Sequence, residues 1–184
     1  LLRELCRIDG LRWIRMLYCY PEHMTDELLD VMAEEEKIVK YLDIPIQHCS
    51  EKVLKAMNRT GGGEALKAQL RHIREKVPGI VLRTTVMTGF PGEGREEFEE
   101  LCSFIKEMRF ERLGCFAFSP EEGTPAYTME GQLSDKVKNR RRDIIMETQS
   151  RIAAEYNEAQ VGRTLEVLVE GYDRYAGCWF GRSA

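Results

Sequence analysis

The sequence predicts an α/β fold with a parallel sheet, followed by a long helix and a short β-rich end. Four strand-like segments, at 12–20, 40–46, 80–88 and 112–118, alternate with helical ones, which is the pattern of βα units. A long helix is expected from about Ser134 to Gln160. Residues 164–173 then alternate apolar and polar side chains, as in an antiparallel strand with one solvated face.

The first half of the chain is expected to hold a helix and two βα units. Residues 1–9 place apolar side chains at helical spacing and stop before Gly10, a typical C-cap. The elements that follow are expected in the order strand 12–20, helix 25–36 with Thr25 as N-cap, strand 40–46, and helix 50–58 with Ser50 as N-cap. Because the alternation opens on a helix rather than a strand, we expect these residues to be the later part of a longer protein.

The second half is expected to continue the same alternation. Its elements, in order, are a flexible TGGG loop at 60–63, helix 64–77 ending at Pro78-Gly79, strand 80–88, the turn GFPGEG at 89–94, amphipathic helix 95–108, strand 112–118 and a polar loop at 119–126. The segment IVLRTTVMT at 80–88 is the clearest strand of the chain.

Composition and charge limit the classes of function. The chain has 43% hydrophobic and 32% charged residues, a normal globular balance. No apolar stretch approaches the roughly 20 residues of a membrane span, so no membrane contact is expected. The formal net charge of −4 offers no general attraction for nucleic acid, so such a partner would have to bind a local basic patch.

The six cysteines, at 6, 19, 49, 102, 115 and 178, include no CxxC pair. In a chain of this size they are interpreted as reduced thiols of a cytoplasmic protein, mostly small buried apolar side chains. Their spacing does not favour a metal site built from these cysteines alone.

Side chains that can carry chemistry gather where the expected strands end. In βα folds, active sites form at the carboxyl ends of the strands, because the βα loops converge there. The residues at these ends, in chain order, are Tyr18, Cys19, Tyr20, Glu22 and His23; Gln47 and His48; Arg83, Thr85 and Met87 with the GFPGE turn; and Phe118, Ser119, Glu121, Glu122 and Thr124.

Each candidate also has a purely structural interpretation. His48 could simply cap a loop. Arg83 lies within a core strand and needs a paired anion, either a ligand or a carboxylate of the protein. The glycines of GFPGE suit either close backbone approach to a ligand or a tight turn.

A basic run opens the long helix. It consists of Lys136, Lys138, Arg140, Arg141 and Arg142. Such a run is usually a solvated helix face, and RNA or ribosome contact is the sharper alternative.

Three segments together, IPIQHCSEKVLKAMNR at 44–59, LRTTVMTGFPGE at 82–93 and FSPEEGTPA at 118–126, resemble the radical S-adenosylmethionine methylthiotransferases. The turn GFPGE alone is shared widely among them, but the three segments in this order are highly specific. Within the family, the chain is most similar to the branch that methylthiolates an aspartate of the twelfth small-subunit ribosomal protein. One reason is that His48 and Arg83 stand where the tRNA-modifying branch typically has serine.

The resemblance implies a domain order and a cofactor site. Residues 1–130 would be the distal half of a partial (β/α) radical SAM barrel, 131–161 a linker helix, and 162–184 the start of an antiparallel TRAM β-barrel that contacts the ribosomal protein substrate. Family members carry two 4Fe-4S clusters, one of which reductively cleaves S-adenosylmethionine to a radical, while sulfur is delivered through the other. By position, the residues expected to bind S-adenosylmethionine are Gln47, His48, Arg83, Thr85, Gly89, Phe118 and Ser119.

The chain departs from the family pattern at several positions. The CxxxCxxC cluster motif is absent, so we expect the cluster cysteines upstream of Leu1 and no activity from these residues alone. Gly94 replaces a capping threonine, at a cost of only a few tenths of a kcal/mol, while Glu97 is kept. Phe118 replaces a common tyrosine.

Three other functions stay open from the sequence. The substrate could be a tRNA adenosine, with the same chemistry. The chain could be a stand-alone module that docks on ribosomal protein or RNA through its arginine run and the strands at 164–184. It could also be an unrelated barrel enzyme in which His48 works with Glu22 or Glu121 as acid and base.

Overall fold

The computed structural model describes all residues, Leu1–Ala184, and contains a parallel four-stranded sheet and a separate antiparallel hairpin. The parallel strands lie side by side in chain order: β1 (Ile14–Met16), β2 (Ile38–Asp43), β3 (Val81–Thr88) and β4 (Arg112–Ala117). The predicted α/β class with a parallel sheet is therefore confirmed.

Helices occupy every segment for which a helix was predicted. They are α1 (Leu2–Cys6), α2 (Asp26–Glu34), α3 (Glu51–Ala56), α4 (Gly63–Lys76), α5 (Arg95–Met108) and α7 (Asp135–Glu158). Two short elements were not predicted, the 3-10 turn η1 (Pro21–His23) and the helix α6 (Pro125–Thr128). No helix combines the length and apolar character needed to cross a membrane.

Local capping explains where several helices begin. The Thr25 hydroxyl accepts a hydrogen bond from the Leu28 N–H at 3.3 Å, as predicted for α2. Ser50 is the N-cap residue of α3, but its hydroxyl makes no capping bond. At α5, the Glu97 carboxylate accepts from the Gly94 N–H at 2.8 Å, so the part of the capping box that needs no side chain at Gly94 is kept.

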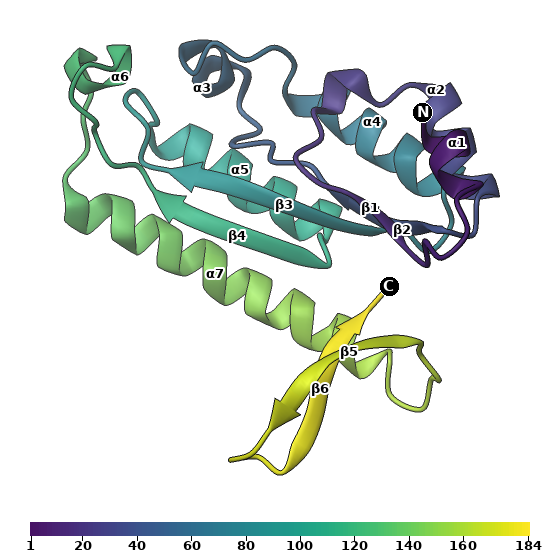
Figure 1. The fold of residues 1–184 in the computed structure, drawn as a ribbon. Helices are drawn as coiled ribbons and strands as arrows, with labels where there is room; N and C mark the ends of the chain where they lie inside the picture. Colours follow the sequence, from purple (N-terminus) through teal and green to yellow (C-terminus); the bar gives the residue numbers. More distant parts are fainter.

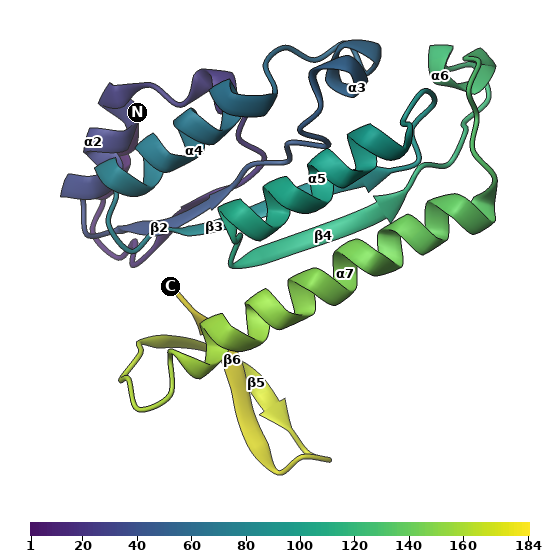
Figure 2. The same ribbon diagram turned by 180° about the vertical axis from the view of Figure 1, so that it is seen from behind.

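The two faces of the sheet have different environments. Helices α2, α4 and α5 lie on the same side of the strands (Figures 1 and 2). Along β3, even-numbered residues from Leu82 to Thr88 are buried and odd-numbered ones are half-buried. The core lies beneath the helices and includes the fully buried Leu70, Phe104 and Ile105, each of which contributes about 1.5–3 kcal/mol by burial. The polar residues of β3 on this face, Thr84 and Thr88, are fully buried and donate hydrogen bonds to backbone carbonyls, whereas Arg83 and Thr85 lie on the other, half-buried face.

The long helix α7 runs beside β4 and covers that edge of the sheet (Figures 1 and 2). Ile145 and Ile152 on its inner side join the core, and the buried Gln149 side chain donates from Nε2 to the Phe110 carbonyl at 2.9 Å. These positions follow helical spacing, so one stripe of α7 is fixed to the sheet.

The hairpin of β5 (Val167–Asp173) and β6 (Cys178–Ser183) projects away from the sheet (Figure 1). The strand predicted at 164–173 is confirmed in type, and its partner β6 lies within the β-rich segment predicted at 164–184. Arg12 binds Glu166 from Nε at 3.0 Å, and Arg15 donates to the Ser183 carbonyl at 3.0 Å. A two-stranded hairpin is not a closed barrel, so the TRAM β-barrel stays a prediction. The four parallel strands form an open sheet, so the partial radical SAM barrel also stays a prediction.

Candidate functional site

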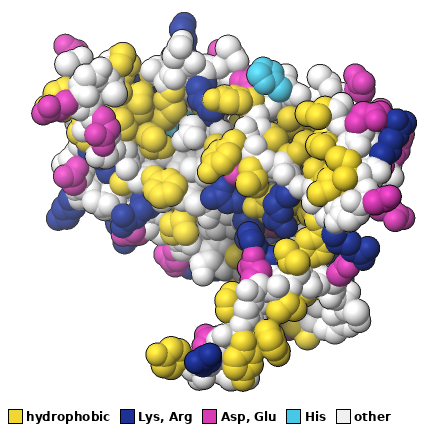
Figure 3. Space-filling model, viewed as in Figure 1, with side chains coloured by type: hydrophobic (Ala, Val, Ile, Leu, Met, Phe, Trp, Pro, Cys, Tyr) yellow, Lys and Arg dark blue, Asp and Glu magenta, His cyan; other side chains and the backbone are white.

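A cleft of about 420 Å³ lies beside the carboxyl ends of β1 and β2 and along the half-buried face of β3. Its lining residues are Tyr18, Cys19, Tyr20, Pro45, Gln47, Arg59, Arg83, Thr85 and Phe116. Three of the residues predicted to bind S-adenosylmethionine, namely Gln47, Arg83 and Thr85, therefore lie together. In the space-filling view, hydrophobic and basic side chains are intermixed over this side of the sheet (Figure 3).

The backbone at Gln47 is held in an unusual conformation. Its φ is 67°, in the left-handed region that non-glycine residues rarely adopt. The Gln47 N–H donates to the Thr85 carbonyl at 2.9 Å, and its carbonyl accepts from the Met87 N–H at 2.7 Å. Tyr18, on the neighbouring wall, has a φ of 58°. Strained residues of this kind concentrate at functional sites, because the surroundings must hold them.

Arg83 has the anionic partner that its position in the strand requires. Its Nη1 lies 2.6 Å from Oδ1 of Asp43, and the register of the sheet places these two residues opposite each other. Asp43 is almost fully buried, whereas the Arg83 side chain is 38% exposed. The ion pair uses one of the five N–H donors of the guanidinium, so others remain for a ligand in the cleft.

Arg59 is a cleft residue that the sequence reasoning missed. Its Nη1 donates to the Pro45 carbonyl at 2.7 Å, and its guanidinium lies 5.1 Å from the centre of the Tyr20 ring. These contacts hold a cation at the cleft without neutralising it. The sequence offered little indication of this role, because Arg59 follows a helix and the candidate residues were sought after strands. Helix α3 is short, so the chain after it returns to the cleft.

Aromatic rings form much of the cleft wall. Tyr18 is 77% exposed, Tyr20 52% and Phe116 61%. Such exposure of large rings around a cleft is typical of a surface that a ligand covers. Burial raises the pKa of the Cys19 thiol, so this cysteine is a protonated apolar side chain of the wall.

His48 lies behind the cleft and does not line it. The ring is fully buried, and its Nδ1 accepts from the Ser50 N–H at 2.9 Å. Its Nε2 is 3.5 Å from Oε2 of Glu93 and has no hydrogen-bond partner. The structural interpretation of His48 as a loop cap is therefore the one that the geometry favours. Neither Glu22 nor Glu121 is its partner, so the acid–base alternative has no support in the geometry.

The other predicted cofactor residues lie apart from the cleft lining. Gly89 is buried against α7, and a Cβ there would lie 2.3 Å from Cγ of Lys138. Phe118 is buried edge-on against Phe90, with ring centres 5.1 Å apart. Ser119 is exposed in the loop after β4. A direct cofactor contact by these residues stays a prediction.

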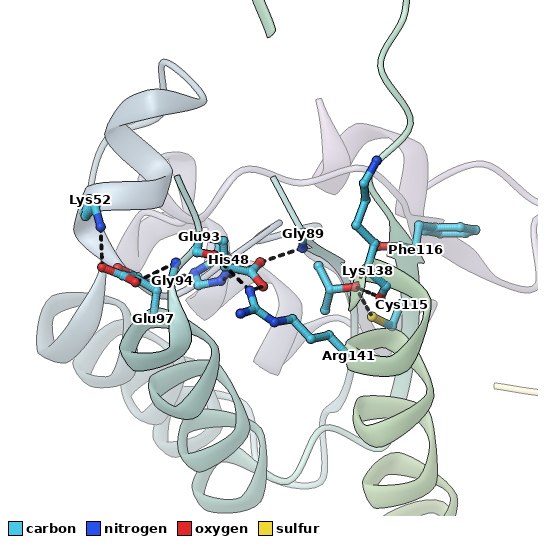
Figure 4. A network of polar contacts seen from close by, with 12 residues as sticks. His48, Lys52, Gly89, Glu93, Gly94, Glu97, Cys115, Phe116, Lys138 and Arg141 are labelled. Atoms are coloured by element: carbon cyan, nitrogen blue, oxygen red, sulfur yellow. Dashed lines mark hydrogen bonds and ion pairs between the residues drawn. The ribbon is translucent and has the colours of Figure 1, made fainter. Parts of the chain in front are cut away.

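The basic run at the start of α7 is not one solvated face. Lys138 is only 3% exposed, and its Nζ donates to the Phe118 carbonyl at 3.2 Å. The Arg141 side chain is 13% exposed and binds Glu93 (Figure 4). Helical periodicity turns these two inward, while Arg140 is exposed and Arg142 pairs with Asp143. The interpretation as a solvated face is wrong for Lys138 and Arg141, so an RNA contact through all three arginines would have to break a buried ion pair.

The chain does not supply a metal site. No three His, Cys, Asp or Glu side chains are grouped so that they could hold a metal ion, and the cysteines are spread over helices, strands and loops. The residues present therefore do not fit a 4Fe-4S cluster, which takes several thiolates on one face.

Comparison with known proteins defines the class. Residues 1–105 match the Radical SAM superfamily, and the chain belongs to it. The fold resembles that of the coproporphyrinogen III oxidase HemN from Escherichia coli, described as a radical SAM enzyme, with a TM-score of 0.60 and 21% identity over 77% of this chain and 32% of that one. The radical S-adenosylmethionine methyltransferase TsrM from Kitasatospora setae is similar at a TM-score of 0.51 and 20% identity, covering 63% of this chain and 24% of that one. These two likenesses concern the fold.

In sequence identity, the chain is much more similar to one kind of enzyme than to these two proteins. It is 51% identical to the ribosomal protein uS12 methylthiotransferase RimO of Caldanaerobacter subterraneus subsp. tengcongensis, over 100% of this chain and 41% of the relative. It is 53% identical to RimO of Anaeromyxobacter sp., over 93% of this chain and 36% of the relative. The predicted resemblance to the methylthiotransferases is confirmed. The chain spans about two fifths of the length of these relatives.

Proposed function

We propose that these residues are the distal part of a radical SAM methylthiotransferase that adds a methylthio group to an aspartate of ribosomal protein uS12. In this proposal, residues 1–130 belong to the radical SAM barrel, 131–161 are the linker helix, and 162–184 begin a TRAM domain that meets the substrate. The observation that best supports this proposal is that Gln47, Arg83 and Thr85 line one cleft, in a chain about half identical to RimO proteins.

The cleft suits S-adenosylmethionine in size and chemistry. Its volume of about 420 Å³ lies in the range of small-molecule sites. Arg59 and the free N–H groups of Arg83 would bind the carboxylate of the methionine moiety, because guanidinium and carboxylate form strong charge-assisted hydrogen bonds. Gln47 and Thr85 offer neutral donors and acceptors, and the exposed rings of Tyr18 and Phe116 offer faces for the adenine.

S-adenosylmethionine would supply both a radical, after one-electron reduction at a cluster, and the methyl group. The part of this chain would be to bind and orient the cofactor over the carboxyl end of β2 and the middle of β3 and to exclude water from it. The cluster ligands and the auxiliary cluster would come from the rest of the enzyme, because the residues present do not fit a cluster.

The test uses the full-length enzyme with Arg59→Ala and Arg83→Ala, and with Arg151→Ala as the matched control. Arg151 lies on α7, is 73% exposed and pairs only with Glu147. Loss of a charge-assisted hydrogen bond costs about 1.5–3 kcal/mol, so each cleft variant should bind S-adenosylmethionine about 10- to 100-fold more weakly in calorimetry. Affinities within twofold of the wild type for both cleft variants, in folded protein, would contradict the proposed site.

The substrate is tested separately. The full-length enzyme is offered uS12 and tRNA in parallel, and methylthiolation of uS12 is expected. Modification of tRNA alone would contradict uS12 as the substrate and would support the alternative, a tRNA adenosine. Salt-sensitive binding of residues 1–184 alone to ribosomal subunits would favour the docking-module alternative.

A further inference from the structure

The first turns of α7 are fastened to the loops that follow the parallel strands. Arg141 donates from Nη1 to Oε1 of Glu93 at 2.5 Å and to the Glu93 carbonyl at 2.9 Å. Lys138 binds the Phe118 carbonyl at the end of β4, and its alkyl chain lies against Gly89 at the end of β3. Burying two cations is costly unless each is well paired, so these contacts are specific attachments rather than incidental packing.

Glu93 extends this attachment from α7 to the loop after β2. Its Oε2 accepts from the Gly89 N–H at 2.8 Å and lies 3.5 Å from Nε2 of His48. Since Nδ1 of His48 accepts from the Ser50 N–H, the ring proton of the neutral imidazole is on Nε2, facing Glu93. One buried carboxylate therefore faces donors from α7, from the turn after β3 and from the turn after β2 (Figure 4).

His48 is directly joined to the strained residue of the cleft. Gln47 lines the cleft while His48 is buried behind it, so the two side chains lie on opposite sides of the same short loop. The left-handed φ of Gln47 persists only if its surroundings hold it. Backbone bonds to Thr85 and Met87 hold one side of this loop. On the other side, the buried His48 ring is held by the hydrogen bond from the Ser50 N–H and by its packing beside Glu93.

We infer that Arg141 is a positioning residue: through Glu93 and His48 it keeps Gln47 in the conformation that the cofactor cleft requires. The linker helix α7 carries the β5–β6 hairpin at its far end, so the same contact couples the hairpin to the cleft. The identity of the ligand rests on the proposed function, whereas the link from α7 to the Gln47 loop does not.

The experiment compares backbone hydrogen exchange in the full-length protein, without cofactor, between Arg141→Gln and the control Arg151→Gln. In Arg141→Gln, amides of residues 44–50 should exchange at least fivefold faster, and those of residues 88–94 faster as well. The control should leave both segments unchanged. Faster exchange confined to α7 would show that Arg141 only stabilises its own helix, and would overturn the inference.

A second measurement separates positioning from folding. The dissociation constant for S-adenosylmethionine should rise at least fivefold in Arg141→Gln and recover in part in Arg141→Lys, which restores a cation. If Arg141→Gln does not fold, the same exchange comparison is made with Glu93→Gln and Arg141→Lys. Amides of residues 44–50 should exchange faster in Glu93→Gln than in Arg141→Lys, and equal, unchanged exchange in both would overturn the inference. If the wild type binds no S-adenosylmethionine, the proposed function fails, but the exchange data still decide whether α7 controls the Gln47 loop.

Discussion

Replacing Gly89 by alanine tests how closely α7 approaches the end of β3. Gly89 has a φ of 77°, and an added Cβ would lie 2.3 Å from Cγ, 2.9 Å from Cβ and 3.1 Å from Cδ of Lys138. The left-handed backbone costs an alanine about 1–2 kcal/mol. Pushing Lys138 away from its buried position adds about 1–3 kcal/mol of overpacking. The expected total is about 2–5 kcal/mol, a large part of the stability of a typical domain.

The control for this prediction is Gly92→Ala, three residues further on. Gly92 has a φ of 83°, but a Cβ there would meet nothing within 4 Å. This variant therefore carries the backbone strain without the contact and should lose only about 1–2 kcal/mol. The difference between the two variants, about 1–3 kcal/mol, isolates the contact with Lys138.

The assay is urea unfolding of both variants, followed by far-ultraviolet circular dichroism. With a slope of about 2 kcal/mol per molar urea, the midpoint of Gly89→Ala should lie about 0.5–1.5 M below that of Gly92→Ala. Equal midpoints would refute the reasoning, because they would show that Lys138 can leave the end of β3 at no cost. In that case the attachment of α7 to the strand ends would be far weaker than its geometry indicates.

Three further predictions concern the core, the thiols and a surface ion pair. Leu70→Ala should cost about 2–5 kcal/mol in the same unfolding assay, because the side chain is fully buried; a loss below about 1 kcal/mol would contradict its place in the core. Burial raises the pKa of Cys115 to about 12, so in the native protein iodoacetamide should label the exposed Cys178 and spare Cys115, as read by mass spectrometry. The hydrogen bond from Lys52 lowers the pKa of Glu97 below its ordinary value of 4.5, so this pair stabilises the fold above that pH and the stabilisation is lost as the pH falls through the lowered pKa. Lys52→Met should therefore cost up to about 1 kcal/mol near neutral pH and nothing in strong acid, and a loss independent of pH would rule out this origin.

The sheet and most helices could be predicted because their signals are local. The amphipathic spacing of 95–108 and the apolar run of 80–88 identify α5 and β3 almost to the residue. β1 is much shorter than predicted, Ile14–Met16 instead of 12–20, because the backbone turns into the left-handed region at Tyr18. Nothing in the residue type of Tyr18 announces that turn.

The candidate site could be predicted only in part, for a reason that lies in packing. Arg83 and Thr85 alternate with buried residues of β3, so the period of the strand places them on the cleft side. His48 follows Gln47 in the sequence, yet the chain direction alone does not say which of the two faces the cleft. The inward direction of Arg141 depends on the partner that Glu93 offers, and that pairing spans 48 residues of sequence.

The strict alternation along β3 also limits how proteins with this fold can change in length. Deleting or inserting a single residue within β3 would exchange its two sets of side chains, sending the Arg83 guanidinium under the helices and Leu82 or Val86 into the cleft. Evolutionary gains and losses of residues should therefore accumulate in segments without such parity, such as the glycine run at 61–63 and the exposed loop at 119–124.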